Sequence, residues 1–291
     1  MKRIAILGCE NSHADAFLKF ICDKEKEEFK DIEVVGIYSD DANACEKLRL
    51  AFNVPVLEDY GDAAGKVDGI IITARHGDNH YKYAKPYIAS KIPMFIDKPI
   101  TVNEDEAIEF MRSLKENGIR ISGGSSLKQD AFVKQLKSEA KNETDGKTIG
   151  GFVRAPYKSE NIYGGFYFYA QHLVEMICEI FGRFPLSVTA KQNGKQVHVL
   201  FHYEEYDCVG VFTDENYMYY ACRMAEKSTK GENIVSTKEW YYREFKEFYD
   251  LLEGSKQSYS YEEFVSPVFI MNAIERSLES GNEEAVRTFN I

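Results

Sequence analysis

The sequence has no long apolar run, no paired cysteines and no excess of positive charge. No apolar stretch approaches the roughly 18 residues that a membrane-spanning helix needs, so we expect no contact with a membrane. The apolar stretch after Met1 is too short for a secretory signal peptide and has no small-residue cleavage site after it, which predicts a cytoplasmic protein. The formal net charge of −11, without a clustered Lys/Arg stripe, argues against nucleic acid as a partner.

The six cysteines are scattered and include no CxxC pair, so neither a zinc site nor a disulfide framework is indicated. We expect reduced, mostly buried thiols. His198 and His202 fall on one face of a predicted strand, but no carboxylate or third histidine joins them at a suitable spacing, and we expect no metal. At 291 residues, the chain is long for one core and natural for two domains.

Residues 1–121 alternate strand and helix patterns. The predicted strands are Ile4 to Leu7, Ile32 to Tyr38, Val67 to Thr73, Met94 to Ile96 and Ile119 to Ser122. The predicted helices are Ala14 to Ile21, Ala42 to Phe52, Asn79 to Ser90 and Glu104 to Glu116. Thr101 and Glu104 have the spacing of a capping box. Repeated βαβ units predict a Rossmann domain, an α/β fold with a doubly wound parallel sheet.

Residues 122–291 have a different pattern, which predicts an α+β domain with a largely antiparallel open sheet. Strands with alternating apolar and polar residues are expected at Ser187 to Ala190, Gln196 to Tyr203, Asp207 to Thr213 and Tyr217 to Met224. Helices are expected at Ala131 to Ala140, around His172, at Tyr241 to Leu252 and at Pro267 to Ser280. Two domains imply a cleft between them.

Lys98 follows an apolar strand and precedes Pro99, which forces an extended exit. This position delivers an ammonium group to the carboxyl end of a strand, where open α/β sheets bind their ligands. His172 offers an imidazole in the second domain. The two residues are candidates for proton transfer and charge stabilisation, although a solvated lysine and an interior histidine are the simpler interpretations.

Four features follow one another along the chain: the turn at Gly8, the segment 73–80, Asp97-Lys98-Pro99, and Gly164-Gly165 followed by His172 and Glu175. In this order they resemble the Gfo/Idh/MocA family of glucose-fructose oxidoreductases and inositol dehydrogenases. The resemblance implies an NAD(P)-dependent oxidoreductase that transfers hydride between a nicotinamide and a hydroxyl-bearing carbon of a sugar, polyol or related small molecule. It also implies that Lys98 stabilises the developing alkoxide, that His172 is the general acid/base, and that the chain forms a homodimer or higher homo-oligomer through its C-terminal sheet.

The same resemblance implies two sets of binding residues. The residues assigned to the cofactor are Gly8, Glu10, Asn11, Ser12, His13, Ser39, Asp40, Thr73, Ala74, His76, His80, Asp97 and Lys98. The residues assigned to the substrate are Lys98, Tyr163, Phe168, His172 and Glu175. His80 has packing or capping as its simpler role, and the aromatic segment 163–169 fits a core or subunit contact as well as stacking on a sugar.

The sequence departs from the family pattern at two places. The turn 8–13 keeps only the first glycine of GxGxxG, and Glu10 brings bulk and negative charge to the position beside the pyrophosphate. If Glu10 turns outward, amides near Ser12 and His13 can still hold phosphate. Phe168 stands where the family has an aspartate four residues before the histidine, while Glu175 is one helical turn from His172 and is expected to orient it.

At the end of the second strand, Ser39 is followed by Asp40 and Asp41, with no arginine nearby, which favours NAD over NADP. An active dehydrogenase is the favoured hypothesis. Glu10 and Phe168 motivate an alternative, a non-catalytic small-molecule-binding or sensor protein with weakened cofactor binding. A third hypothesis is a lyase or hydrolase that keeps its cofactor tightly bound for transient oxidation.

Overall fold

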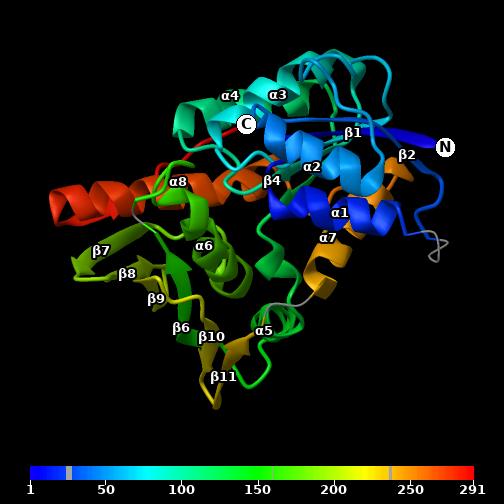
Figure 1. Ribbon diagram of the computed structural model, residues 1–291. Coiled ribbons are helices and arrows are strands. Elements are labelled where there is room, and N and C mark those ends of the chain that lie inside the picture. The colour runs from blue at the N-terminus through cyan, green and yellow to red at the C-terminus, as the bar shows by residue number, and fades with distance from the viewer. Residues whose placement is uncertain (24–27, 159, 236–237) are drawn as a thin grey trace.

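The computed structural model describes residues 1–23, 28–158, 160–235 and 238–291, which form two sheets with helices packed against them (Figure 1). The first part of the chain contains β1 (Lys2–Leu7), α1 (Ser12–Ile21), β2 (Ile32–Tyr38), α2 (Ala42–Phe52), β3 (Gly69–Ile72), α3 (Asp78–Ala84), the 3-10 helix η1 (Lys85–Ser90), β4 (Met94–Asp97), α4 (Glu104–Glu116), β5 (Ile121–Gly124), the 3-10 helix η2 (Ser126–Gln129) and α5 (Ala131–Lys141). The second part contains β6 (Thr148–Tyr157), α6 (Tyr167–Phe181), β7 (Ser187–Asn193), β8 (Gln196–His202), β9 (Asp207–Asp214), β10 (Tyr219–Ala225), β11 (Ser228–Ile234), α7 (Lys238–Leu252), α8 (Tyr261–Ser280) and β12 (Glu283–Ala285).

The first sheet is fully parallel and has the strand order β2-β1-β3-β4-β5. Strands β3 and β4 are buried at every residue, because helices cover both faces of the sheet. The strand order reverses between β1 and β3, and the carboxyl ends of these two strands therefore form the ligand crevice of such folds. The predicted Rossmann domain is confirmed.

The second sheet has seven strands in the order β11-β10-β6-β9-β8-β7-β12. Neighbouring strands within this sheet are antiparallel, except for β6 and β9, which are parallel. The predicted α+β domain with a largely antiparallel sheet is also confirmed. Helices α6 and α8 pack on one face of this sheet.

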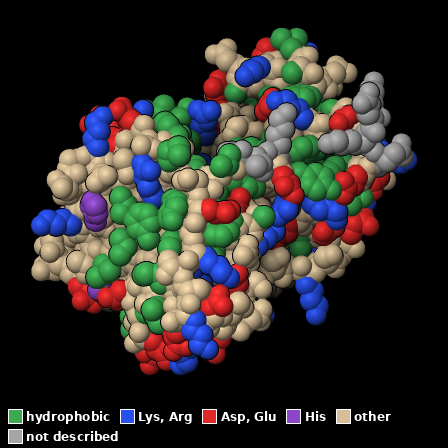
Figure 2. Space-filling model, turned by 90° about the horizontal axis from the view of Figure 1, so that it is seen from below, with side chains coloured by type: hydrophobic (Ala, Val, Ile, Leu, Met, Phe, Trp, Pro, Cys, Tyr) green, Lys and Arg blue, Asp and Glu red, His purple; other side chains and the backbone are tan. Residues whose placement is uncertain are grey.

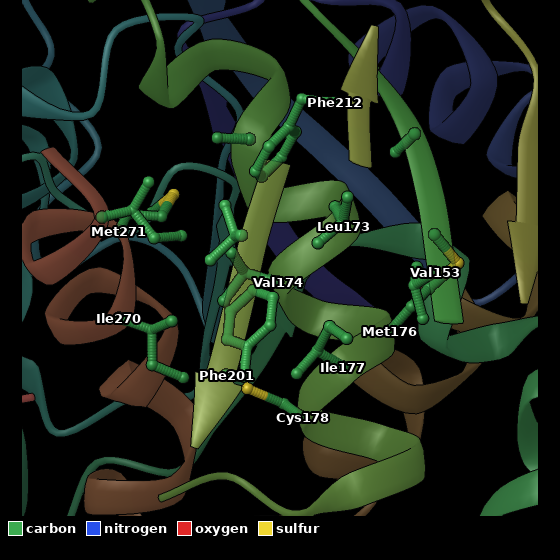
Figure 3. Close-up of a cluster of buried hydrophobic side chains, with 14 of the residues drawn as sticks. Val153, Leu173, Val174, Met176, Ile177, Cys178, Phe201, Phe212, Ile270 and Met271 are labelled. Carbon is green, nitrogen blue, oxygen red and sulfur yellow. The ribbon is translucent and has the colours of Figure 1, made fainter. Parts of the chain in front are cut away.

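Helix α6 is apolar around nearly its whole circumference, which is typical of a helix enclosed by the protein. Figure 3 shows its side chains between the sheet and α8. The labelled residues are Leu173, Val174, Met176, Ile177 and Cys178 of α6, Val153, Phe201 and Phe212 of the sheet, and Ile270 and Met271 of α8. This packing fixes the position of His172 on the same helix.

Helix α7 returns from the second sheet to the first domain. Phe245 and Phe248 are fully buried there, and their rings contact Phe17 of α1 and Phe95 of β4. Beyond α8, the chain also ends against the first domain, where the carbonyl of Ile291 accepts a hydrogen bond from Lys115 (Figure 1). Residues late in the sequence therefore reach the edge of the first sheet.

Several local predictions were wrong. Thr101 and Glu104 do not form a capping box; instead Asn103 caps α4, and its Oδ1 accepts hydrogen bonds from the backbone N–H groups of Asp105 and Glu106 at 2.9 and 3.0 Å. The helix expected over residues 79–90 divides into α3 and η1, because Pro86 supplies no backbone N–H.

Three strands of the second sheet were not predicted: β6, β11 and β12. The strand β6 contains two glycines and a proline, β11 is mainly polar, and β12 has only three residues. Such strands lack the apolar alternation that marks a strand in a sequence. The boundary between the domains at residue 121 stays a prediction, and β5 crosses it.

Candidate active site

A cavity of about 280 Å³ lies at the carboxyl edge of the first sheet, where that sheet meets α6 and α7. It is lined by Asn11, Ser12, His13, Arg75, Lys98, Ser126, Leu127, Phe168, Tyr169, His172, Tyr219, Trp240 and Tyr241. Two larger hollows, of about 660 and 560 Å³, lie beside α5 and are lined by none of the predicted site residues. The chemistry is therefore concentrated in the smaller cavity.

Lys98 stands directly after β4 and lines this cavity, although only 4% of its surface is exposed. Its Nζ donates a long hydrogen bond of 3.4 Å to the carbonyl of Phe168 and lies 4.2 Å from the centre of that ring. In the described part of the chain this is the ammonium group's one hydrogen bond. Burial lowers the pKa of Lys98, and the charge of Asp97 opposes that shift.

His172, near the start of α6, lines the same cavity. Its Nδ1 lies 2.7 Å from Oγ of Ser125, the residue that follows β5. Burial, reinforced by the positive charge of Lys98, puts the pKa of His172 well below its ordinary value of 6.5. The imidazole is therefore neutral at neutral pH.

The expected pair of Glu175 and His172 does not form. Glu175 is 2% exposed, and its carboxylate accepts hydrogen bonds from Arg183 Nη2 at 2.8 Å and from Gln171 Nε2 at 3.2 Å. It does not line the cavity. Glu175 thus belongs to a buried ion pair behind the site, and Ser125 is the partner of the histidine.

His13 is held between two carboxylates. Its Nδ1 lies 3.1 Å from Oδ2 of Asp97, and its Nε2 lies 3.1 Å from Oε2 of Glu244 on α7. Burial alone would lower the pKa of His13, but Asp97 and Glu244 outweigh burial and raise this pKa to about 10. The ring is therefore an imidazolium at neutral pH, and it closes one wall of the cavity.

Asp97 has no exposed surface and is occupied by protein groups. Its Oδ2 accepts a hydrogen bond of 2.8 Å from Asn11 Nδ2, and its Oδ1 accepts one of 2.7 Å from the backbone N–H of Lys98. Although burial opposes the shift, the charge of His13 keeps the pKa of Asp97 below its ordinary value. Asp97 thus holds the first turn and Lys98 together, and it has no surface left for a ligand.

The turn after β1 is tightly packed against the end of β3. Gly8 has φ +77°, and a Cβ atom there would lie 2.3 Å from the backbone nitrogen of Ala74. Thr73 Oγ1 donates a hydrogen bond of 3.0 Å to the carbonyl of Gly8. Position 8 therefore needs glycine, as the first position of a dinucleotide turn does. Asn11 stands at the N-cap of α1 without a side-chain capping bond.

Glu10 does not turn outward. Its Oε2 accepts a hydrogen bond of 2.6 Å from Ser39 Oγ, and its Oε1 accepts one of 2.9 Å from the backbone N–H of Arg75. Ser39 follows β2 and Arg75 lies beyond β3, so the carboxylate extends across the end of β1, which lies between them. The side chain is fixed inward because the ends of the two neighbouring strands each offer it one donor.

Asp40 lies next to Ser39 and is exposed. Its carboxylate accepts hydrogen bonds from the hydroxyl groups of Tyr38 at 2.7 Å and Tyr83 at 2.9 Å. The bond from Tyr38 is the main reason why the pKa of Asp40 is lowered. A fixed negative charge therefore stands at the end of β2.

Three other predicted residues lie around the site without lining the cavity. His80 is fully buried, with its ring nitrogens 2.8 Å and 3.2 Å from the carbonyl oxygens of Ala74 and Ile100, and thus links two loops. Tyr163 accepts a hydrogen bond of 3.0 Å from Arg75 Nη1. His76 is partly exposed, and its Nδ1 accepts a hydrogen bond of 3.3 Å from the N–H of Asp78.

The sequence analysis did not identify Ser125, Glu244, Tyr219 or Tyr241, whereas Tyr169, which lines the cavity with these two tyrosines, lies in the aromatic segment 163–169 that it singled out. Ser125 follows a glycine pair at the end of a strand, which was the available signal for it. Nothing in the sequence near Glu244 marks it, because its partner is 231 positions away. In the described ranges, we find no group of three or more His, Cys, Asp and Glu side chains that could hold a metal ion.

The protein resembles known oxidoreductases in sequence and in fold. Residues 2–125 match the Gfo/Idh/MocA family model, described as an oxidoreductase family with an NAD-binding Rossmann fold. No curated protein matches the sequence. Within the described ranges, no helix is long and apolar enough to cross a membrane.

Several solved structures share the fold over nearly their whole length. A scyllo-inositol dehydrogenase from Lactobacillus casei, with bound NAD(H) and scyllo-inositol, has a TM-score of 0.84 at 13% identity, covering 99% of this chain and 100% of that one. A myo-inositol dehydrogenase from Corynebacterium glutamicum has a TM-score of 0.83 at 15% identity, with the same coverage. A myo-inositol 2-dehydrogenase from Lactobacillus plantarum has a TM-score of 0.82 at 14% identity, covering 98% of this chain and 99% of that one.

These findings confirm the predicted oxidoreductase class and its NAD-binding Rossmann domain. At such low identity, the similarity between the structures establishes the fold alone. Residues 2–125 thus match the model of the Gfo/Idh/MocA oxidoreductase family, and the whole chain shares the two-domain fold of the solved inositol dehydrogenases.

Proposed function

We propose that this protein is a nicotinamide-dependent dehydrogenase that acts on a CH–OH group of a sugar, polyol or related small molecule. One observation carries the proposal: the buried ammonium of Lys98 and the neutral imidazole of His172 line one cavity at the ligand-binding edge of a Rossmann sheet. Oxidation of an alcohol needs a proton acceptor and a positive group beside the oxygen, and the cavity offers both.

Lys98 is suited to stabilise the oxygen of the reacting alcohol. Its ammonium group donates one long hydrogen bond, to the carbonyl of Phe168, and lines the cavity. In a site with little water, a fixed positive charge stabilises a developing alkoxide more strongly than in solution. Lys98 would therefore lower the cost of removing the hydroxyl proton.

His172 is suited to accept that proton. A base needs a free lone pair, so the useful tautomer carries its hydrogen on Nδ1 and leaves Nε2 unprotonated. Oγ of Ser125, 2.7 Å from Nδ1, can accept the hydrogen bond from that N–H group. The lowered pKa of His172 keeps the ring neutral and ready to act.

The turn after β1 fits a dinucleotide in its backbone. Gly8 has the required positive φ, and the helix α1 directs its first N–H groups, from Ser12 on, toward this edge. Ser39 and Asp40, at the end of β2, would bind the ribose. The nicotinamide ring would supply the hydride acceptor. The side chain of Glu10 extends from this turn across the end of β1, where the dinucleotide would bind.

NAD is the preferred cofactor in this proposal, and the tyrosines that line the cavity suit a sugar or polyol. Asp40 and Asp41 place negative charge where NADP would bring a phosphate. The rings of Tyr169 and Tyr219 line the cavity and can stack on the C–H face of a sugar, while Lys98 binds its hydroxyl groups.

A binding or sensor protein without catalysis is the second candidate, and two observations favour it. Glu10 occupies two hydrogen-bond donors beside the dinucleotide turn, the hydroxyl of Ser39 and the backbone N–H of Arg75. Phe168 contacts Lys98 at the position where the family has an aspartate, so that the predicted catalytic group lacks one acidic member.

Dinucleotide titration and turnover separate these candidates. We expect NADH or NADPH to bind, as measured by nicotinamide fluorescence, and a panel of inositols and sugars to include a substrate that is oxidised. Lys98→Met keeps the bulk but removes the charge, and it should reduce kcat by roughly 10² to 10³ while leaving the dinucleotide Kd nearly unchanged.

Lys66→Met, at an exposed lysine, is the matched control and should behave as the wild type. No binding of either dinucleotide at millimolar concentration would exclude a dehydrogenase. Unchanged turnover in Lys98→Met would remove this residue from the catalytic role.

We also propose that two copies associate through the open face of the second sheet. Leu200 and Val209 pair across β8 and β9 on that face and are half-buried in the single chain. A partner sheet would cover these apolar side chains. The cytoplasmic location stays a prediction from the sequence.

A further inference from the structure

The carboxylate of Glu10 lies where a dinucleotide has to cross the sheet. The neighbouring strands β2, β1 and β3 end side by side, with Ser39 after β2 and Arg75 beyond β3. Glu10 joins the two ends by accepting one hydrogen bond from each, at 2.6 and 2.9 Å. Its side chain therefore extends over the end of β1, the switch point where such folds bind dinucleotides.

The two groups that Glu10 occupies are of the kind that a dinucleotide would use. The hydroxyl of Ser39, at the end of β2, is placed for a ribose, and the backbone N–H of Arg75, beside the turn, is placed for a phosphate oxygen. Ser39 is only 9% exposed and Arg75 N is already bonded, so neither is available while Glu10 remains in place. In this arrangement, the carboxylate substitutes for the anion of a ligand.

The negative charge of Glu10 also opposes the binding of a dinucleotide. A dinucleotide brings a pyrophosphate to a turn that already contains Glu10, and Asp40 adds a second carboxylate at the end of β2. Like charges at close range in a partly enclosed site repel each other. A 2′-phosphate on the ribose would come closest to Ser39 and therefore to the carboxylate bonded to it.

We propose that Glu10 is an intramolecular latch on the dinucleotide site: its carboxylate has to leave Ser39 and Arg75 before a dinucleotide binds, and it excludes NADP more strongly than NAD. This inference rests on the proposed function. Glu10 thereby sets both the affinity for the cofactor and the choice between the two cofactors.

Binding measurements on two variants test the latch. Glu10→Ala removes the carboxylate, and we expect the Kd for NADH to fall by about tenfold, because the hydrogen bonds to a charged group no longer have to be broken. The Kd for NADPH should fall further. Glu10→Gln keeps the shape without the charge and should give intermediate values. Isothermal titration calorimetry of the wild type and the two variants measures all six dissociation constants without turnover.

Glu33→Ala is the matched control, because Glu33 is an exposed glutamate at the opposite end of β2 and its replacement changes the net charge equally. Its dinucleotide affinities should equal those of the wild type. Thermal unfolding confirms that each variant is folded, and Glu10→Gln serves if Glu10→Ala is not.

The outcomes separate the two proposals. Wild type and Glu10 variants that bind NADH equally well would overturn the latch and leave the dehydrogenase intact. Weaker binding by Glu10→Ala would also overturn the latch, since it would make Glu10 a ligand of the ribose. If no variant binds either dinucleotide, the proposed function fails as well.

Discussion

Burial acts on the two candidate catalytic side chains in the same direction but with different results. It lowers the pKa of Lys98, where the charge of Asp97 opposes the shift. It also lowers the pKa of His172, where the positive charge of Lys98 adds to the shift. Because the ordinary pKa of lysine, 10.5, is far above the 6.5 of histidine, the proton of this pair resides on Lys98 rather than on His172. Oxidation of an alcohol needs this arrangement, a positive group beside a free base.

Among the single residues of the site, Ser125 should act as a positioning residue for His172. Ser125→Ala removes the oxygen that holds Nδ1, so kcat should fall by about tenfold with little change in KM. Because that oxygen also stabilises the protonated ring beside the positive charge of Lys98, its loss should move the acid limb of the pH–rate profile to lower pH. Steady-state kinetics between pH 5 and 9 measure both effects.

Ser122→Ala is the matched control, since Ser122 is a buried serine of β5, the strand that Ser125 follows, and its hydroxyl has no hydrogen-bond partner in the described structure. Its pH profile should match that of the wild type. An unchanged acid limb in Ser125→Ala would show that Ser125 has only a structural role.

Lys98 and His172 were accessible to sequence analysis because each belongs to a local pattern. Ser125 was not, because its partner is 47 positions away and the bond exists only after α6 packs beside β5. Likewise, the family pattern suggested Glu175 as the partner, but Arg183, eight residues further along, binds that carboxylate.

At the scale of elements, His13 joins α1, β4 and α7 through one imidazolium. Asp97 on β4 and Glu244 on α7 lie on opposite sides of the ring, and all three side chains are buried. Burial raises the pKa of Glu244, while His13 opposes this shift. Removal of the central cation would leave two buried acids facing each other, which is costly.

The free energy of unfolding should therefore depend on pH through the contact of His13 with Asp97 and Glu244. His13 has a pKa of about 10 in the folded protein against an ordinary value of 6.5, so its stabilising contribution is complete below about pH 6.5 and is lost as the pH rises through 10. The free energy of unfolding, measured with denaturant, should therefore fall between about pH 6.5 and pH 10. His13→Gln should destabilise the protein by about 3 kcal/mol at pH 7 and abolish the decline.

His80→Gln is the control, because His80 is equally buried but has a lowered pKa and bonds to two carbonyl oxygens. Its variant should keep the decline in stability toward pH 10. If His13→Gln keeps that decline, the imidazolium is not its cause.

Most long elements of the first domain could be predicted, since their apolar runs and caps are local. Helix α4 begins and ends at the predicted residues, 104 and 116. Helix α2 begins after Asp41, whose carboxylate caps it. β11 and β12 could not be predicted, because a strand at the edge of a sheet is held by pairing with a neighbour rather than by its own apolar pattern.

At the scale of the whole molecule, the described helices that pack on the second sheet, chiefly α6 and α8, cover one of its two faces. Figure 2 shows hydrophobic side chains gathered on the face seen from below, with charged side chains around them. On the open face of the sheet, the rings of Phe152 and Tyr220 lie 5.9 Å apart, and both are only half-buried. A second copy would cover such a surface.

We therefore expect a homodimer that an introduced charge disrupts. Leu200→Glu places a carboxylate on the open face and should convert the dimer to a monomer at micromolar concentration, as measured by light scattering after size-exclusion chromatography. Leu50→Glu, at an exposed leucine of α2, is the control and should remain dimeric. A monomeric wild type, or a dimeric Leu200→Glu, would contradict this interface.

The sequence by itself determined the order of strands and helices in the first domain, the glycine turn, the lysine after β4 and the histidine on α6, because each depends on residues close together in the chain. Only the tertiary structure decided that Ser125 holds His172, that α7 brings Glu244 to His13, and that Glu10 bends inward to Ser39 and Arg75. Those contacts join distant segments, and they form where buried polar groups need partners that the local sequence does not supply.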